Sequence, residues 1–277
     1  MDKYCAISII CRNENQYLKE WIDYHLLIGF DHIQIWDNDS RIPIKETVKE
    51  YIDNKTVSVK HVAGLSKHRQ CYTQSSSVRN TLRDYKWIAL IDTDEFIVLL
   101  DKDTNIKRYL EQYEDYGAVG LNWLMFNSNG HENTPRSQLE SFTKAMINEP
   151  ANKHIKSIVQ TKYFFNIVNP HYAQTKRSLV NVKKEKMEQT AFNDPPIINE
   201  VMRINHYFTR SKEDWELKRR RGPGDGSANP AKDGFSQKYT EKLFQHFEKQ
   251  DGVQNYDILD LIKRIEGEKN SSGDNNV

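Results

Sequence analysis

The sequence contains few cysteines and no long apolar run, and both absences narrow the class of protein. Its three cysteines are an odd number without C-x-x-C spacing, which disfavours a disulfide scaffold and a cysteine-based zinc site. No stretch approaches the ~18 apolar residues of a membrane-spanning helix. The apolar run over residues 6–11 is too short and has the wrong flanks for a signal peptide. We therefore expect a soluble, reduced, cytoplasmic protein.

The sequence also lacks an excess of charge of either sign. Lys and Arg total 40 against 39 for Asp and Glu, and this near-neutral balance disfavours a nucleic-acid partner. Mean hydropathy is low, at −0.80. However, 11 Phe, 14 Tyr and 5 Trp supply bulky side chains for a core. The length of 277 residues predicts one large or two small domains.

The first hundred residues alternate between short apolar runs and helical spacing. Apolar runs predict strands over 6–11, 32–36, 57–62 and 87–91. Helical spacing predicts helices over 18–27, where Gly29 ends the helix, and over 44–51 and 69–84. This alternation is typical of an α/β fold with a mostly parallel, Rossmann-like sheet and helices on both faces. Ligands of such sheets bind beyond the carboxyl ends of the strands.

The pattern changes after residue 105. We expect a strand over 118–123, a loop over 126–136 and a smaller, partly antiparallel extension over 137–210. Ser211 is a candidate N-cap with Asp214 at N3, and amphipathic helices are expected near 239–249 and 255–266. These helices are expected to pack on the core, with peripheral membrane contact or a second subunit as alternatives. We predict one domain over 1–267, in halves 1–104 and 105–267, and a disordered tail over 268–277.

The segment Trp87 to Phe96 carries the most specific chemistry. An apolar strand delivers Asp92 and Asp94, and side chains two apart in an extended chain share one face. Both carboxylates could then bind one Mg²⁺ or Mn²⁺ ion that bridges substrate phosphates. Two further D-x-D triplets, at 37–39 and 101–103, show that the spacing alone is weak, and a solvated turn is the alternative.

Several motifs in order along the chain carry a resemblance. They are Cys11 to Glu14, Leu18 to His25, Trp36 to Ser40, Trp87 to Phe96, Asn122 to His131, and Asn205 to Tyr207 with Ser211 and Lys218. Over roughly residues 4–225 the sequence resembles the GT-A glycosyltransferases of the family 2 and family 92 group. Asn127 departs from the pattern, because the family usually has glycine at this position of the middle loop.

The resemblance implies a GT-A fold and an enzyme that moves a sugar from a nucleotide diphosphate donor, most simply a UDP-sugar, to a hydroxyl. It implies an acceptor that is a glycan or glycolipid, inversion at the anomeric carbon, and a role in polysaccharide or glycan synthesis. The first half would bind the donor and the second the acceptor. The cofactor would be Mn²⁺ or Mg²⁺, with Asp92, Asp94 and His206 as its ligands.

The resemblance and the residues themselves suggest roles for further positions. Donor-binding candidates are Arg12, Asn13, Glu14, Asp37, Arg69, Gln70, Asp92, Thr93, Lys218 and Arg221. The cations among 218–221 suit a diphosphate, although a solvated helix end with favourable dipole interactions is the alternative. Glu132 is the preferred catalytic base and His131 the second choice. Trp123 and His171 are candidates for the acceptor side.

Two other functions compete with a glycosyltransferase. A sugar nucleotidyltransferase would be expected to have an early glycine-rich phosphate loop, and residues 11–16 contain no glycine. A noncatalytic carbohydrate-binding or scaffold protein on the same fold is the other alternative; retention of Asp92, Asp94 and His206 argues against it. The sequence does not specify the donor sugar, the linkage or the oligomeric state.

Overall fold

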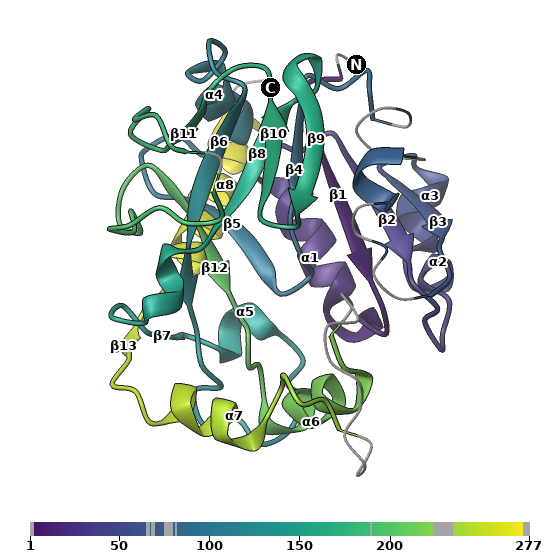
Figure 1. Cartoon of the computed structure of the whole chain (residues 1–277), viewed down its shortest axis with the longest axis vertical. Helices are drawn as coiled ribbons and strands as arrows, with labels where there is room; N and C mark the ends of the chain where they lie inside the picture. Colours follow the sequence, from purple (N-terminus) through teal and green to yellow (C-terminus); the bar gives the residue numbers. More distant parts are fainter. Residues whose placement is uncertain are drawn as a thin grey trace.

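The structure, a computed structural model, describes residues 3–64, 67, 70–74, 80, 82–188, 190–223 and 235–273. A nine-stranded sheet forms its centre (Figure 1). The strand order is β3 (Val57–His61), β2 (His32–Asp37), β1 (Cys5–Cys11), β4 (Trp87–Leu90), β8 (Ile155–Gln160), β6 (Ala118–Met125), β12 (Met202–His206) and β5 (Glu95–Leu99), and β11 (Leu179–Asn181) pairs with β6.

Most strands of this sheet run in one direction. β3, β2, β1 and β4 are mutually parallel, and β12 and β11 run parallel to β6. β8 is antiparallel to β4 and β6, and β5 is antiparallel to β12. The carboxyl ends of β1, β4, β6 and β12 therefore meet the amino ends of β8 and β5 at one edge. This confirms the predicted GT-A type of α/β fold with a mostly parallel sheet.

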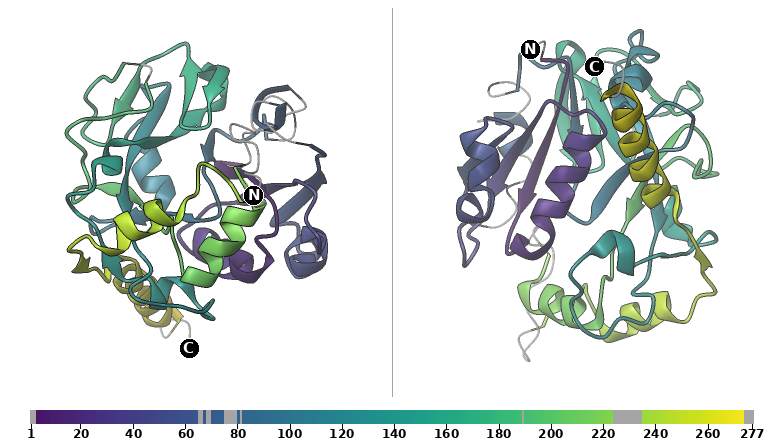
Figure 2. Two further views of the ribbon diagram at one scale, coloured as in Figure 1. Left: turned by 60° about the horizontal axis from the view of Figure 1, so that its bottom comes forward. Right: turned by 180° about the vertical axis from the view of Figure 1, so that it is seen from behind.

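One face of the sheet packs against helices. α1 (Asn15–Leu27), α4 (Ile106–Glu111) and α8 (Asp257–Gly273) contribute buried side chains to one large core with α2 (Ile44–Thr47) and α3 (Lys49–Asp53). α1 and α8 lie over this face in the right-hand view of Figure 2. The other face is covered by the β9 (Phe164–Asn169) and β10 (Tyr172–Thr175) hairpin with the short helical turn η1 (Gln70–Gln74). The helices of the described ranges thus gather mainly on one face, not evenly on both.

A further layer lies beyond the carboxyl ends of β1 and β12, at the bottom of Figure 1. It contains α5 (Gln138–Ser141), α6 (Lys212–Arg221), α7 (Glu241–Glu248) and the pair β7 (Lys144–Ala145) and β13 (Val253–Gln254). Two short 3₁₀ turns, Pro150–Lys153 and Thr161–Tyr163, flank β8. This layer brings α6 to the edge where the strands end.

Local signals in the sequence account for several element ends. Gly29 follows α1 with a φ of +106°, a conformation that glycine adopts without strain. The Ser211 hydroxyl accepts the Asp214 N–H at 3.1 Å and the Asp214 carboxylate accepts the Ser211 N–H, so the predicted capping box is confirmed. No helix among the residues in the described ranges is long and apolar enough to cross a membrane.

Two predicted helices differ from the structure. α8 continues to Gly273, beyond the predicted end of this helix near residue 266 and into the segment predicted to be disordered, of which residues 274–277 lie outside the described residues. The Glu268 carboxylate accepts the Thr104 hydroxyl at 2.7 Å and ties this last part of α8 to the loop before α4. Within the helix expected over 69–84, residues 70–74 form η1 and residues 82–84 form a turn, whereas 69, 75–79 and 81 lie outside the described residues. Ile258, Leu261 and Ile265 of α8 are buried in the core, as predicted for the C-terminal helices.

Candidate active site

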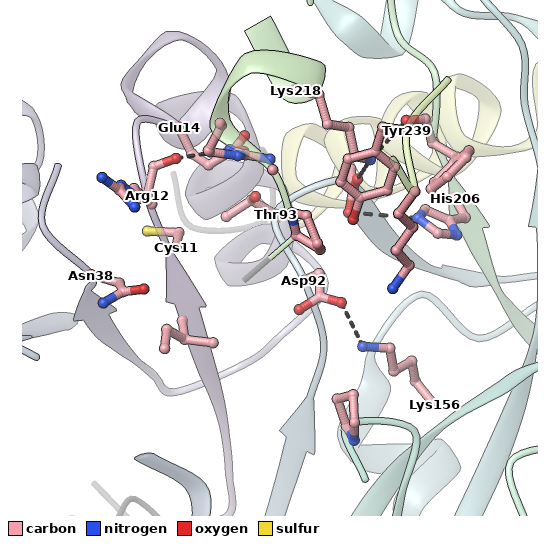
Figure 3. Close-up of a pocket in the computed structure, with 18 of the residues that line it drawn as sticks. Cys11, Arg12, Glu14, Asn38, Asp92, Thr93, Lys156, His206, Lys218 and Tyr239 are labelled. Atoms are coloured by element: carbon pink, nitrogen blue, oxygen red, sulfur yellow. Dashed lines mark hydrogen bonds and ion pairs between the residues drawn. The ribbon is translucent and has the colours of Figure 1, made fainter. Parts of the chain in front are cut away.

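A cavity of about 400 Å³ opens at the edge where the strands end (Figure 3). It lies beyond the carboxyl ends of β1 and β4, the position predicted for a ligand of this fold. Residues from both halves of the chain line it. They include Arg12, Glu14, Asn38, Asp92, Thr93, Asp94, Trp123, His154, Lys156, His171, His206, Lys218, Arg221 and Tyr239.

The two aspartates lie in a turn between β4 and β5. The Glu95 N–H donates to the Asp92 carbonyl at 3.1 Å, and the Asp92 N–H donates to the Glu95 carboxylate at 2.9 Å. The chain therefore reverses over residues 92–95, so the prediction that Asp92 and Asp94 share one face of an extended strand was wrong. Strand β5, which follows at once, was not predicted.

Each aspartate is paired with a different lysine. Nζ of Lys156 lies 2.6 Å from Oδ2 of Asp92, as the dashed line in Figure 3 marks. Nζ of Lys218 lies 2.9 Å from Oδ2 of Asp94 and also donates to the Phe208 carbonyl at 2.9 Å. Opposite charges this close favour the ionised forms of both partners.

His206 lies beside Asp94, on its other carboxylate oxygen. Nε2 of His206 is 3.6 Å from Oδ1 of Asp94. Burial lowers the pKa of His206 although the Asp94 charge opposes this, so the imidazole is neutral near pH 7. Burial alone would raise the pKa of Asp94, but the Lys218 charge and His206 hold it well below its usual range.

The predicted metal set is only partly assembled. Asp94 and His206 are adjacent, whereas Asp92 is bound to Lys156. Within the described part of the chain, no three His, Cys, Asp or Glu side chains come together in a metal-binding arrangement. Among the predicted metal ligands, Asp94 and His206 are therefore the pair that offers suitable donor atoms, an oxygen and an imidazole nitrogen.

Lys156 was not identified from the sequence. Its side chain is 2% exposed near the amino end of β8, and its Nζ also lies 3.5 Å from Oε2 of Glu95. Glu95 is fully buried, and burial raises its pKa to about 8 although the Lys156 charge opposes this. A lone lysine between Ile155 and Ser157 gives no local signal of such a role.

Glu14 is held by two arginines from the α6 region. Its Oε2 lies 2.6 Å from Nη1 of Arg210, and its Oε1 pairs with Arg221. Burial opposes ionisation, but these two arginines lower the pKa of Glu14 to about 2. Arg210 also donates to the Thr93 carbonyl at 3.0 Å, and Arg221 donates to the Arg12 carbonyl at 2.8 Å. Arg210, which no sequence motif indicated, thus joins the ends of β1 and β4 to α6.

The acceptor-side candidates Trp123 and His171 lie in the cavity wall and are joined by His154. Ring centroids of His154, His171 and His206 lie 4.9, 5.2 and 4.3 Å from that of Trp123. Nδ1 of His171 lies 3.1 Å from the Ile155 carbonyl, which can only accept, so Nδ1 carries the proton and Nε2 the lone pair. Burial, with the Lys156 charge, lowers the pKa of His171 to about 3.

Other predicted residues lie outside this cavity lining. The two Asp37 oxygens accept the N–H groups of Ser40 and Ile44, each at 3.0 Å, so Asp37 fixes the loop before α2, and its neighbour Asn38 lines the cavity instead. Asn13 is exposed, with its Oδ1 accepting the Arg41 N–H at 2.8 Å. Gln70 is an exposed residue of η1, and Arg69 lies outside the described residues.

The two candidate bases also lie outside the lining. The His131 ring packs on Phe142 with centroids 5.8 Å apart, and Glu132 is exposed. The carbonyls of His131 and Glu132 accept the N–H groups of Lys212 and Glu213 at 3.0 and 2.9 Å. This loop therefore supports the first turn of α6 and presents neither side chain to the cavity.

Comparisons with known proteins identify the family. The sequence profile of glycosyltransferase family 92 matches residues 4–221. A family 92 protein of Ricinus communis is 24% identical over 184 residues, which are 65% of this chain and 33% of the relative. A family 92 protein of Oryza sativa subsp. japonica is 24% identical over 204 residues, which are 73% of this chain and 32% of the relative. The chain thus spans about a third of the length of these curated relatives.

Solved structures are more distant. A 1–349 fragment of S. aureus TarS has a TM-score of 0.40 and 12% identity, covering 77% of this chain and 63% of that chain. The same fragment in complex with UDP has a TM-score of 0.38 and 12% identity, covering 57% and 47%. The profile match over most of the sequence decides the assignment: the chain belongs to glycosyltransferase family 92.

Proposed function

We propose that this chain transfers a sugar from a UDP-linked donor to a hydroxyl of a glycan or glycolipid. Membership of family 92 supports the class of reaction. One observation carries the proposal: Asp92, Asp94, Lys218 and Arg221 from distant parts of the chain line one cavity at the edge where the strands end. Carboxylates with adjacent cations suit a nucleoside diphosphate, whose leaving phosphates need positive charge.

The diphosphate would be held by cations from α6. Lys218 and Arg221 both line the cavity, and their side chains are 12% and 25% exposed. A lysine point charge and an arginine fork in a partly desolvated site interact strongly with phosphate oxygens. Lys156 adds a third, fully buried cation beside Asp92.

A divalent cation would be held by Asp94 and His206. The 3.6 Å between Oδ1 of Asp94 and Nε2 of His206 allows both atoms to contact one ion, while Lys218 stays on the other Asp94 oxygen. The lowered pKa of His206, caused mainly by burial, keeps its imidazole available as a ligand. When bound, Mn²⁺ or Mg²⁺ would neutralise the charge of the departing diphosphate.

The acceptor hydroxyl would be oriented by neutral imidazoles. All three carboxylates in the described cavity lining, on Glu14, Asp92 and Asp94, have cationic partners. Nε2 of His171, whose Nδ1 donates to a carbonyl, would accept a hydrogen bond from the attacking hydroxyl. We propose direct attack on the anomeric carbon, with inversion: the acceptor oxygen forms the new bond as the bond to the phosphate oxygen breaks, UDP leaves with the bonding electrons, and the hydroxyl proton passes to water through Nε2 of His171.

Thermal unfolding with and without Mn²⁺ tests this function. UDP-glucose, UDP-galactose and UDP-N-acetylglucosamine are the probes, and GDP-mannose is the control nucleotide. A ligand present at ~100 times its Kd stabilises the folded state by about 2.7 kcal/mol. We expect metal-dependent stabilisation by at least one UDP-sugar and release of UDP from that donor.

The matched variants are Asp94→Asn and Asp101→Asn. Asp101 belongs to another D-x-D triplet, is exposed and lies outside the cavity lining. Asp94→Asn should lose donor stabilisation and UDP release, whereas Asp101→Asn should retain both. Stabilisation without UDP release or transfer would favour the noncatalytic binding protein, and no stabilisation by any nucleotide would contradict both.

A further inference from the structure

A second cavity, of about 660 Å³, adjoins the candidate active site. It is larger than the first and has residues of the β1–α1 loop, the β2–α2 loop and α6 in its lining. Both cavities share Arg12, Glu14, Asp94, Lys218 and Arg221. A ligand in the second cavity would therefore lie next to the groups proposed to hold the donor diphosphate.

The lining of the second cavity has an excess of positive charge. Six of its residues are cationic and four are acidic. Glu14 is neutralised by Arg210 and Arg221, and Asp94 by Lys218. The other two acids, Glu213 and Asp214, accept hydrogen bonds from the Thr134 N–H and from the Tyr17 and Ser211 hydroxyls. The remaining cations are Arg12, Arg41 and Arg220, and none of these three forms an ion pair with a carboxylate of the described residues. Three guanidinium groups that lack a carboxylate partner among the described residues, around one cavity, favour an anionic ligand.

Buried polar atoms in the same lining have no hydrogen-bond partner in the described ranges. Thr209 is 1% exposed, and its hydroxyl oxygen has no partner. Nε of Arg12 and Nε of Arg210 are buried and likewise without a partner. Because a buried donor without a partner is costly, groups of this kind indicate a ligand that supplies acceptor oxygens.

Apolar side chains lie in the same lining as the arginines. Ile42 is 57% exposed and Leu217 is 58% exposed, although both are large and apolar. Such side chains are covered when a ligand brings an apolar group of its own. The lining thus combines an oxyanion site with apolar surface.

We propose that the second cavity binds the phosphate group of a phosphate-bearing acceptor. Arg12, Arg41 and Arg220 would hold the phosphate, and an apolar part of the acceptor would cover Ile42 and Leu217. Phosphate fits better than carboxylate, because its three terminal oxygens and double charge can engage more than one guanidinium. The role as acceptor rests on the proposed function, whereas phosphate binding in this cavity can be tested without it.

Thermal unfolding of the full chain in sodium phosphate, against sodium chloride at equal ionic strength, tests the site. A phosphate concentration of ~10 times its Kd should raise Tm by roughly 2–4 °C. Octyl phosphate should act at a lower concentration than inorganic phosphate because its chain covers the apolar side chains. Equal potency of the two would overturn the apolar part of the proposal.

The localising variant is Arg41→Gln/Arg220→Gln. Both side chains are exposed, so the fold should tolerate the change. This arginine variant should lose the phosphate-induced rise in Tm. The control Lys186→Gln/Lys242→Gln removes the same charge from exposed lysines outside both cavity linings and should keep the rise. An unchanged rise in the arginine variant would overturn the site.

Saturating UDP separates the two cavities. If UDP occupies the first cavity, phosphate should still add its own rise in Tm; a phosphate effect that UDP abolishes would mean that phosphate binds only with the donor groups, and would overturn the proposal. If UDP itself gives no stabilisation, the donor assignment fails, and the arginine variant alone still decides whether the second site exists.

Discussion

The Lys156 ammonium is buried within β8 and lies 2.6 Å from the Asp92 carboxylate, which is 36% exposed at the cavity. Lys156 therefore connects the sheet interior to the candidate active site. Burial alone would lower the pKa of Lys156, but the charges of Asp92 and Glu95 raise it, so this lysine is charged at every physiological pH. The position of Asp92 depends on a cation that the substrate does not supply.

At pH 9, where Glu95 is ionised, replacing Lys156 with Met should destabilise the protein by about 3–5 kcal/mol, because the buried Glu95 carboxylate would lose its nearby cation. Urea unfolding measures this loss. The control is Lys86→Met, which breaks an ion pair with Glu114 whose partners are 31% and 43% exposed and should cost less than about 1 kcal/mol. Equal costs for the two variants would contradict the role of Lys156.

Replacing Lys218 with Met should have opposite effects on metal binding and on turnover. Without the Lys218 ammonium, both Asp94 oxygens are free for a cation. The Mn²⁺ concentration that gives half-saturation should therefore fall by roughly tenfold, or about 1.4 kcal/mol in binding free energy. Turnover should fall by roughly 10²-fold, because the diphosphate loses one stabilising charge. Mn²⁺ titrations of UDP release measure both effects.

Arg219→Gln provides the control for Lys218, because Arg219 lies on the same helix but pairs with Glu216. The Arg219 variant should change neither the Mn²⁺ concentration for half-saturation nor the turnover. A weaker Mn²⁺ dependence in the Lys218 variant would argue that Asp94 does not bind the metal.

His25 should make the protein less stable in acid. Its imidazole is fully buried, its Nδ1 lies 2.8 Å from the Trp21 carbonyl, and burial lowers its pKa to about 3. A lowered folded-state pKa gives stability that is present above the unfolded value of about 6.5 and is lost as pH falls towards 3. Between pH 7.5 and 5.0 this loss is about 2 kcal/mol.

Urea unfolding at these two pH values checks the contribution of His25. In His25→Gln the free energy of unfolding should fall by about 2 kcal/mol less between pH 7.5 and 5.0 than in the wild type, whatever the absolute stability of the variant. His131→Gln, at a partly exposed position outside the core, should keep the wild-type dependence. An identical slope in wild type and the His25 variant would contradict the assignment.

Replacing Ser211 with Ala should lower the free energy of unfolding by about 1–2 kcal/mol, because it removes the capping box at the start of α6. Ser211 is fully buried, so the Asp214 N–H would not be solvated in its place. Thr240→Ala, which removes the single cap bond of α7, is the comparison and should cost less. Thermal unfolding of both variants measures the difference, and equal costs would mean that the second half of the capping box contributes nothing.

The features predicted correctly from the sequence are those with a local cause. β1, β2 and α1 follow from apolar spacing, and Ser211 and Gly29 mark helix ends because their own backbone or side chain creates the signal. The D-x-D segment lies at the cavity as expected, but its backbone geometry depends on the Glu95 side chain, which binds the Asp92 N–H. No pattern in residues 92–95 alone distinguishes that turn from an extended strand.

The residues that were missed act across long distances in the sequence. Lys156 lies 64 residues from Asp92, and Arg210 lies 196 residues from Glu14. A single cation in an apolar strand, or before a helix, gives no sign of which carboxylate it will meet. The base candidates Glu132 and His131 were chosen for their place in the loop after Trp123, and the backbone of that loop instead supports α6.

The order of strands has a consequence for how the chain acquires its fold during synthesis. β4 and β5 are neighbours in the sequence, yet β8, β6 and β12 lie between them in the sheet. The only strand that pairs with β5 in the described sheet is β12, which ends at His206. A nascent chain ending before that residue would expose an unpaired apolar strand beside the D-x-D turn, so we expect ribosome-bound intermediates up to this length to depend on chaperones.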